Sequence, residues 1–188
     1  MKYLLFPLFL LAAVPAIHAE TLAIDPNHSA VAFSWNHHGI SNPVARFEKI
    51  EGKLMLDGTD VTKSSVVVKL AMDGLHTAVP ALDQRLKTAE FLDAAAYPEI
   101  TFKSTRIEKG PMDTLKISGD LSLHGVTRPV VLNGKINKIS MDPMAKASEA
   151  GFDAMVTLKR SDFGVSKFLT SVADELQVHM TISANSEG

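Results

Sequence analysis

The sequence of 188 residues contains no cysteine. Without thiols the chain has no disulfide framework, no thiolate metal site, no iron–sulfur cluster ligands and no thiol nucleophile. Its fold must therefore be stabilised by packing, and the length is enough for one domain with a substantial core.

Aromatic residues and runs of a single charge are also scarce. Only 6% of the residues are aromatic, and 19 Lys and Arg residues stand against 21 Asp and Glu residues, a formal net charge of −2. Nucleic-acid-binding proteins use basic patches, and single-strand binders add aromatic side chains on which bases stack. The composition disfavours both classes of protein.

One concentrated apolar stretch lies at the N-terminus. Lys2 supplies a positive charge, residues 4–17 are apolar, and the small residue Ala19 follows. This pattern is typical of a secretory signal peptide, and the run is shorter than the ~20 residues that a spanning helix needs. We predict that residues 1–19 are a signal peptide cleaved after Ala19 and that residues 20–188 form a single domain. An uncleaved membrane anchor is the alternative.

Beyond residue 20, apolar and polar residues alternate with a period of two far more often than they recur at helical spacing. Such alternation predicts strands with one buried and one exposed face, as in an antiparallel sheet. Turn-forming pairs such as Asp57-Gly58 and His124-Gly125 separate the runs. With the two least regular runs last, strands are predicted at residues 31–36, 66–72, 100–103, 115–123, 152–159, 176–183, 52–56 and 130–136.

Residues 80–96 break this alternation and favour helix, because they are rich in Ala, Leu, Gln, Lys and Glu. Pro80 suits a first helical turn, and Tyr97-Pro98 is expected to end the helical stretch. We therefore expect an all-β fold, an antiparallel barrel of about eight strands with one or two short helices covering one end. Such a barrel is filled by side chains or holds one small ligand, and alternation alone leaves both open.

Four short motifs lie along the chain in a characteristic order. They consist of Asp25-Pro26, His28-Ser29, Val31, Phe33-Ser34, His37, Gly39 and Ser41; Phe91, Asp93, Tyr97-Pro98, Ile100, Thr101-Phe102 and Ser104; Gly119, Leu121, Leu123 and residues 124–129 (His-Gly-Val-Thr-Arg-Pro); and Arg160, Asp162-Phe163-Gly164, Val172 and Asp174-Glu175-Leu176. Together they resemble the YceI-like family over nearly the whole of residues 20–188.

The resemblance implies a lipocalin-like barrel, usually exported to the bacterial periplasm, that binds a long isoprenoid such as a polyprenyl phosphate or a quinone tail. Trp35 suits the mouth of such a barrel, because its indole N–H needs a polar partner while the rest of the ring is apolar. Ordinary core packing is the alternative for each expected lining residue. The residues expected to line the ligand site are Phe33, Trp35, Val68, Leu70, Leu86, Phe91, Phe102, Leu121, Leu123 and Val156.

Two positions depart from the family pattern. Where the family commonly has Arg-Asp-x-His-Leu, residues 82–86 read Leu-Asp-Gln-Arg-Leu, and Ala45 stands where Gly is usual. The first change removes a polar pair from the expected lid. Arg85 is expected either to donate to a phosphate or carbonyl of the ligand, or to be a solvated helix residue.

The histidines form no recognisable metal motif. His37 and His38 are adjacent, so an extended segment points them to opposite faces, and no His-x-x-x-His pair exists. We expect no metal site, with His28 and His37 in buried hydrogen bonds and His38 exposed.

Motifs of the common enzyme classes are missing as well. The sequence has no Gly-x-Ser-x-Gly elbow, no phosphate-binding loop and no dinucleotide fingerprint, and no spacing pairs two carboxylates. We expect no enzyme and no catalytic cofactor. The expected function is a periplasmic carrier or reservoir that binds an isoprenoid lipid (a polyprenyl phosphate or a ubiquinone-like quinone) for transport, storage or stress response.

The expected partners are the lipid and a transient membrane or redox partner, with the protein a monomer or homodimer. Two other classes stay open. One is an enzyme that acts on a lipophilic isoprenoid, and the other is a stress protein whose filled barrel holds no ligand.

Overall fold

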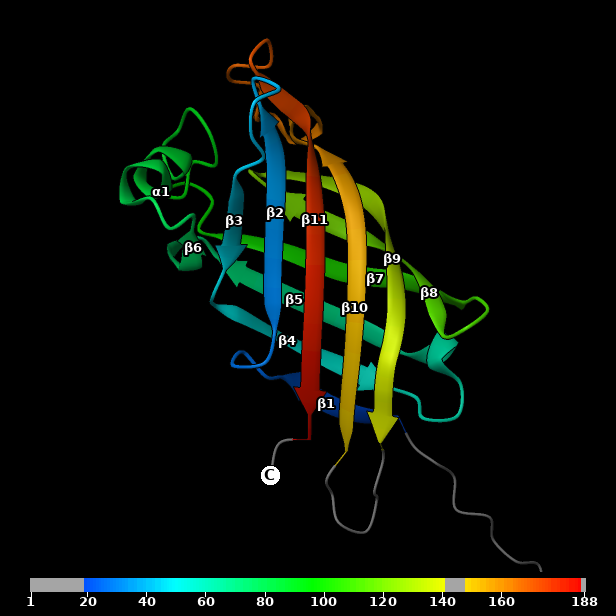
Figure 1. Ribbon diagram of the computed structural model, residues 1–188. Helices are drawn as coiled ribbons and strands as arrows, with labels where there is room; N and C mark the ends of the chain where they lie inside the picture. The colour runs from blue at the N-terminus through cyan, green and yellow to red at the C-terminus, as the bar shows by residue number, and fades with distance from the viewer. Residues whose placement is uncertain (1–18, 141–147, 187–188) are drawn as a thin grey trace, which may run out of the picture.

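The computed structural model describes residues 19–140 and 148–186 (Figure 1). All of the predicted signal peptide except Ala19 lies outside the described residues, so its cleavage stays a prediction. Within the described part of the chain, no helix is long and apolar enough to cross a membrane.

Strands dominate the structure and form one antiparallel sheet (Figure 1). The helical elements are α1 (Pro80–Leu86) and three short 3-10 helices, η1 (Val61–Lys63), η2 (Met72–Gly74) and η3 (Arg160–Phe163). The strands are β1 (Glu20–Ile24), β2 (Ala30–His37), β3 (Val44–Phe47), β4 (Ile50–Leu56), β5 (Ser65–Ala71), β6 (Leu75–His76), β7 (Glu99–Lys109), β8 (Thr114–Leu123), β9 (Val126–Ser140), β10 (Glu149–Lys159) and β11 (Val172–Asn185).

These eleven strands make a closed barrel of eight, because three positions in the ring are each shared by two consecutive strands. In the first shared position, β1 and β2 both pair with β11. In the second, β4 pairs with β1 and β3 pairs with β2. In the third, β5 pairs with β4 and β6 pairs with β3. The ring closes where Ala23 pairs with Asn185 and Ile24 with Ala184. The predicted all-β antiparallel barrel of about eight strands is confirmed.

Alternation in the sequence did not predict the shorter strand at each of the three shared positions. β1, β3 and β6 have five, four and two residues, which is too short for alternation to stand out. In the predicted helical segment only α1 is an α-helix, and it begins with Pro80 at the first turn as expected. The residues after α1 form turns, including bonds from the N–H groups of Phe91 and Asp93 to the carbonyl of Thr88.

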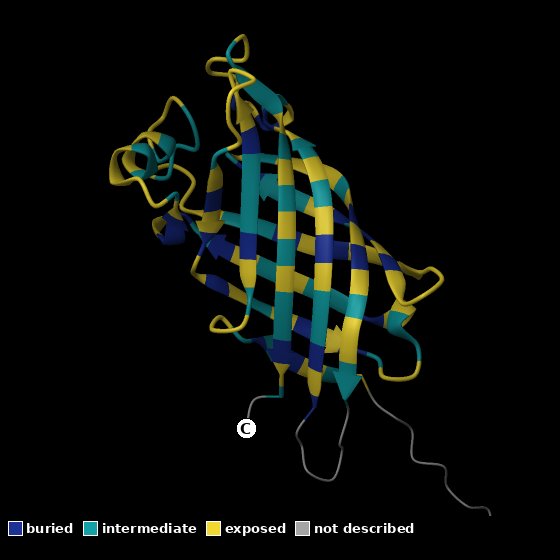
Figure 2. Cartoon of the chain, in the orientation of Figure 1, coloured by how far each residue is buried: buried dark blue, intermediate teal, exposed yellow. Residues whose placement is uncertain are grey.

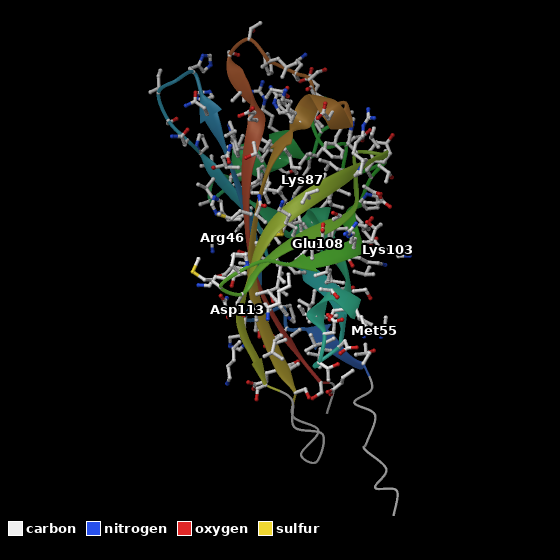
Figure 3. The ribbon with its side chains drawn as sticks, turned by 90° about the vertical axis from the view of Figure 1, so that its right-hand side faces the viewer. Arg46, Met55, Lys87, Lys103, Glu108 and Asp113 are labelled. Atoms are coloured by element: carbon white, nitrogen blue, oxygen red, sulfur yellow. The ribbon has the colours of Figure 1, made fainter. Side chains whose placement is uncertain are left out.

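Side chains alternate between the inside and the outside of the barrel wall, as the striped strands of Figure 2 show. On β5, Val67 is exposed while Val68 and Leu70 face inward. On β7, Lys103 and Glu108 extend outward from the wall (Figure 3). Period-two patterning therefore assigned the inner face of β5 correctly.

One end of the barrel is sealed by a tightly packed cluster that we call the floor. It consists of Leu22, Leu54, Leu56, Ala150 and Ala184, all of which are buried. Beside it the hydroxyl of Ser148 donates to the Glu20 carboxylate at 2.6 Å. The opposite end, which we call the mouth, is where α1, the β8–β9 turn and the loop between η3 and β11 come together (Figure 1).

Candidate functional site

The barrel encloses an inner cavity of about 180 Å³. Strands on every side of the barrel contribute to its wall, and all lining residues except Ser64 and Asp153 are apolar. A cavity of this kind offers no hydrogen bonds along most of its length, so it suits an apolar chain and excludes charged ligands.

A second cavity, of about 500 Å³, lies at the mouth. The two cavities share Phe33, Leu92, Leu123 and Leu176, so they adjoin at these four side chains. Polar side chains gather at the mouth cavity, and they are His37, His38, Arg85, Arg160 and Ser171. The site is thus an apolar inner cavity beside a mouth cavity that carries polar side chains.

Every residue predicted from the sequence to contact a ligand lines one of these two cavities, although contact with a ligand stays a prediction. Phe33 and Leu123 line both cavities. The inner cavity is also lined by Val68, Leu70, Phe102, Leu121 and Val156. The mouth cavity is also lined by Trp35, Arg85, Leu86 and Phe91.

Sequence reasoning passed over several lining residues. Leu176, Val178 and Met180 lie on a strand that it had identified, and their alternation was the available signal. Arg160 belongs to the last of the four motifs, which was the available signal, whereas Phe168 lies in an irregular loop with no periodicity and no motif to mark it.

Arg85 lies across the mouth between two aromatic rings. Its guanidinium carbon is 5.7 Å from the centre of the Phe91 ring and 5.3 Å from that of Phe168, distances typical of cation–π contact. Nearby, the Lys167 ammonium donates to the Glu90 carboxylate at 2.8 Å, which lowers the pKa of Glu90. These contacts join the segment after α1 to the loop between η3 and β11.

The position of Arg85 is compatible with both alternatives, and its contact with a ligand stays a prediction. The residue is exposed to solvent, yet it lines the mouth cavity. Its guanidinium has no carboxylate partner among the salt bridges of the described residues. A positive group of this kind is available to an acceptor that enters the mouth.

The loop between η3 and β11 is anchored by the buried side chain of Arg160. Its guanidinium donates to four backbone carbonyls at 2.8–3.0 Å, those of Val165, Lys167, Val172 and Ala173. Burial lowers the pKa of Arg160, and the charge of Asp174 acts in the opposite direction. The planar fork of arginine reaches several acceptors at once, which the single ammonium of lysine does not.

Asp174 completes this anchor from the first residues of β11. Its carboxylate accepts from the backbone N–H of Ser161 at 2.9 Å and from the Ser161 hydroxyl at 2.7 Å. Burial by itself raises the pKa of Asp174, but these two bonds and the nearby Arg160 outweigh it and hold the pKa below its usual range. The motif residues Arg160 and Asp174 thus hold the loop between η3 and β11 in place.

The β8–β9 turn packs against the same anchor. A Cβ on Gly125, where φ is +74°, would lie 2.5 Å from the Tyr97 ring, so only glycine fits there. The neighbouring His124 ring contacts Tyr97 at 5.0 Å between centres, and its Nδ1 hydrogen-bonds with the carbonyl of Phe163 at 3.0 Å. Residues of three separate sequence motifs therefore meet at the mouth.

The expectation for the first two histidines is wrong. His28 lies in the turn between β1 and β2, where it is exposed, and its ring bonds the Asp25 carboxylate at 2.5 Å. His37 is exposed because β2 ends there, beyond the packed wall. His38 is exposed, as predicted. Across residues 19–140 and 148–186, no group of three His, Asp or Glu side chains is arranged to hold a metal ion.

Comparisons with known proteins agree with this architecture. A UPF0312 protein of Vibrio cholerae serotype O1 is 32% identical over 176 residues, covering 90% of this chain and 93% of its own. Burkholderia cenocepacia BcnA has the same fold, with a TM-score of 0.75 and 20% identity over 85% of this chain and 98% of its own.

A further solved structure is a polyisoprenoid binding domain from Saccharophagus degradans, implicated in plant cell wall breakdown. It has a TM-score of 0.70 and 12% identity, and covers 88% of this chain and 98% of its own. The model of the YceI-like domain matches residues 22–184. The resemblance noted in the sequence is confirmed, and the chain belongs to the YceI-like family.

Proposed function

We propose that this protein binds a long isoprenoid lipid, with the apolar tail in the inner cavity and the polar head group at the mouth. One observation carries the proposal: the apolar inner cavity adjoins the polar-lined mouth cavity at the shared residues Phe33, Leu92, Leu123 and Leu176. The polyisoprenoid binding domain with the same fold supports this class of ligand.

The affinity for the tail would come from burial of apolar surface. Each buried CH₂ group contributes about 0.8 kcal/mol, so burial of about ten carbons offers on the order of 8 kcal/mol before ordering costs. An apolar wall distinguishes tails weakly, because one methylene changes the free energy by only ~1–3 kcal/mol. Selection among ligands therefore falls to the polar groups of the mouth.

Arg85, His37 and His38 are the groups that would recognise the head group. A polyprenyl phosphate would accept charge-assisted hydrogen bonds from the Arg85 guanidinium. A quinone carbonyl would accept a hydrogen bond from Arg85 or from a histidine ring N–H. Both head groups are chemically compatible with the mouth. Measuring the affinity of the protein for each ligand would rank them.

The predicted signal peptide supports a role in the periplasm, as a carrier or reservoir for transport, storage or stress response. Amino-terminal sequencing of protein from the periplasmic fraction tests this. We expect the mature chain to begin at Glu20. A chain that begins at Met1 and stays with the membrane fraction would favour an uncleaved anchor.

Ligand binding is tested by native mass spectrometry and organic extraction of the purified protein, and by melting temperature with added polyprenyl phosphate or isoprenoid quinone. We expect Val68→Trp, which fills the inner cavity, to abolish the shift in melting temperature. Val67→Trp is the matched control, because Val67 is the adjacent valine on β5 and points outward.

Three outcomes separate the candidate functions. Co-purified lipid, or a shift that Val68→Trp removes and Val67→Trp keeps, supports the carrier. No lipid and no shift with either ligand favours the filled barrel. Chemical conversion of the added lipid during incubation favours the enzyme.

A further inference from the structure

Three apolar side chains at the mouth end are exposed to solvent. Ile40, at the tip of the turn between β2 and β3, is 85% exposed. Phe168 and Leu169, in the loop between η3 and β11, are 41% and 42% exposed. We call these three residues the rim, since both segments extend past the wall at the top of Figure 1.

The rim is held in place by specific backbone contacts. The N–H of His38 donates to the carbonyl of Ser171 at 3.0 Å and so joins the two segments. The N–H of Ile40 donates to the carbonyl of His37, also at 3.0 Å. The carbonyl of Phe168 accepts from Val172 at 2.8 Å, although φ of Phe168 is +58°, a conformation that large side chains rarely adopt. The exposed apolar groups are therefore presented by ordered turns.

The two rim segments carry no acidic side chain. Residues 36–44 and 163–173 contain no Asp and no Glu, but they contain His37, His38 and Lys167. Lys167 forms an ion pair with Glu90, a residue that lies outside these two segments. Nothing on the rim segments themselves repels an anionic phospholipid head group, and exposed Ile, Leu and Phe are side chains that enter the interfacial region of a bilayer.

The size of the rim argues against a stable protein interface. Three partly exposed side chains present on the order of a few hundred Å² of apolar surface. A stable complex buries about 800 Å² on each partner. A small apolar tip beside an entrance is sufficient, however, for reversible insertion into a membrane surface.

We infer that the rim docks the mouth of the barrel onto a phospholipid bilayer. Phe168 belongs both to the rim and to the wall of the mouth cavity, so docking places the entrance against the membrane. A long isoprenoid then passes between the bilayer and the barrel without exposing its tail to water. The purpose of docking rests on the proposed function, whereas docking itself is measured without any isoprenoid.

The experiment is flotation of the purified protein with vesicles of phosphatidylethanolamine and phosphatidylglycerol. We expect Ile40→Asp/Leu169→Asp to weaken vesicle binding about tenfold or more, because charged side chains do not enter the apolar layer. Met112→Asp is the matched control. Met112 is 87% exposed in the turn between β7 and β8, at the end of the barrel opposite the mouth, and is expected to leave binding unchanged.

The outcomes are distinct. Loss of binding in the double variant with retention in Met112→Asp supports docking by the rim. No vesicle binding by the unmodified protein, equal binding by all three proteins, or a dimer that the double variant dissociates in sedimentation would overturn it. The double variant should keep its shift in melting temperature with detergent-solubilised quinone or polyprenyl phosphate, so loss of docking and loss of the lipid site are told apart.

Discussion

The floor and the mouth are built on the same barrel but are held together by different interactions. At the floor, Leu22, Leu56 and Ala184 are fully buried against one another. At the mouth, side chains are partly exposed, and the loop between η3 and β11 is fixed by the hydrogen bonds of Arg160. Apolar packing closes one end, whereas directional polar bonds hold an open shape at the other.

This difference follows from what each end must do. Apolar packing is non-directional and leaves few voids, so it suits a seal. Hydrogen bonds to specific carbonyls fix a loop without filling the space beside it, which leaves the mouth cavity of about 500 Å³. We therefore expect stability to depend most on the floor and ligand exchange to depend most on the mouth.

The largest expected effect is that of a truncation at the floor. Leu56→Ala removes a side chain with 0% exposure and leaves a cavity, which costs about 3–4 kcal/mol of unfolding free energy. Leu86→Ala, on α1 at the mouth, removes a half-buried side chain and should cost about 1 kcal/mol. Chemical denaturation followed by circular dichroism measures both, and equal losses would contradict the comparison.

A smaller loss is expected when the polar anchor of the mouth is altered. Arg160→Lys keeps the charge but leaves several buried or part-buried carbonyls without a donor, so we expect a loss of about 2 kcal/mol. Arg128→Lys is the control, because Arg128 is exposed and donates to the carbonyl of Asp162 at 3.3 Å, a longer bond than those of Arg160. If Arg160→Lys is as stable as Arg128→Lys, the four bonds do not anchor the loop.

The contrast between the ends also explains how far the sequence alone could go. Alternation located the long strands and their inner faces, as with Val68 and Leu70 on β5, because a period of two leaves no freedom in which face a residue occupies. It could not say which end of the barrel is open, because Leu56 at the floor and Leu86 at the mouth are both leucines in apolar patterns. The exposure of each depends on what packs over it from distant parts of the chain.

The mouth was the less predictable end for a physical reason. The partners of Arg160 are backbone carbonyls, which every residue carries, so no residue type in the sequence marks them. Phe168 faces the mouth because of a left-handed backbone that aromatic residues seldom adopt, so local preference points away from it. Arg85 was identified only because it departs from a family motif.

The smallest expected effect is a response of the mouth to acid through Asp174. The pKa of Asp174 is lower in the folded protein than its ordinary value of 3.8. The unfolded chain therefore takes up this proton first as the pH falls. The stability that Asp174 contributes is complete above about pH 5 and is lost as the pH drops through 3.8 toward the folded pKa.

Trp35 allows this effect to be observed at the mouth, since it is the sole tryptophan and lines the mouth cavity. In acid titrations we expect Trp35 fluorescence to change at a higher pH than the circular dichroism of the barrel. Asp174→Asn should shrink that separation, because it removes the titrating carboxylate, whereas Asp162→Asn, at an exposed neighbour, should leave it unchanged. If the fluorescence and circular dichroism transitions of the unmodified protein coincide, the mouth and the floor unfold as one unit. In that case the different interactions at the two ends do not give them different stability in acid.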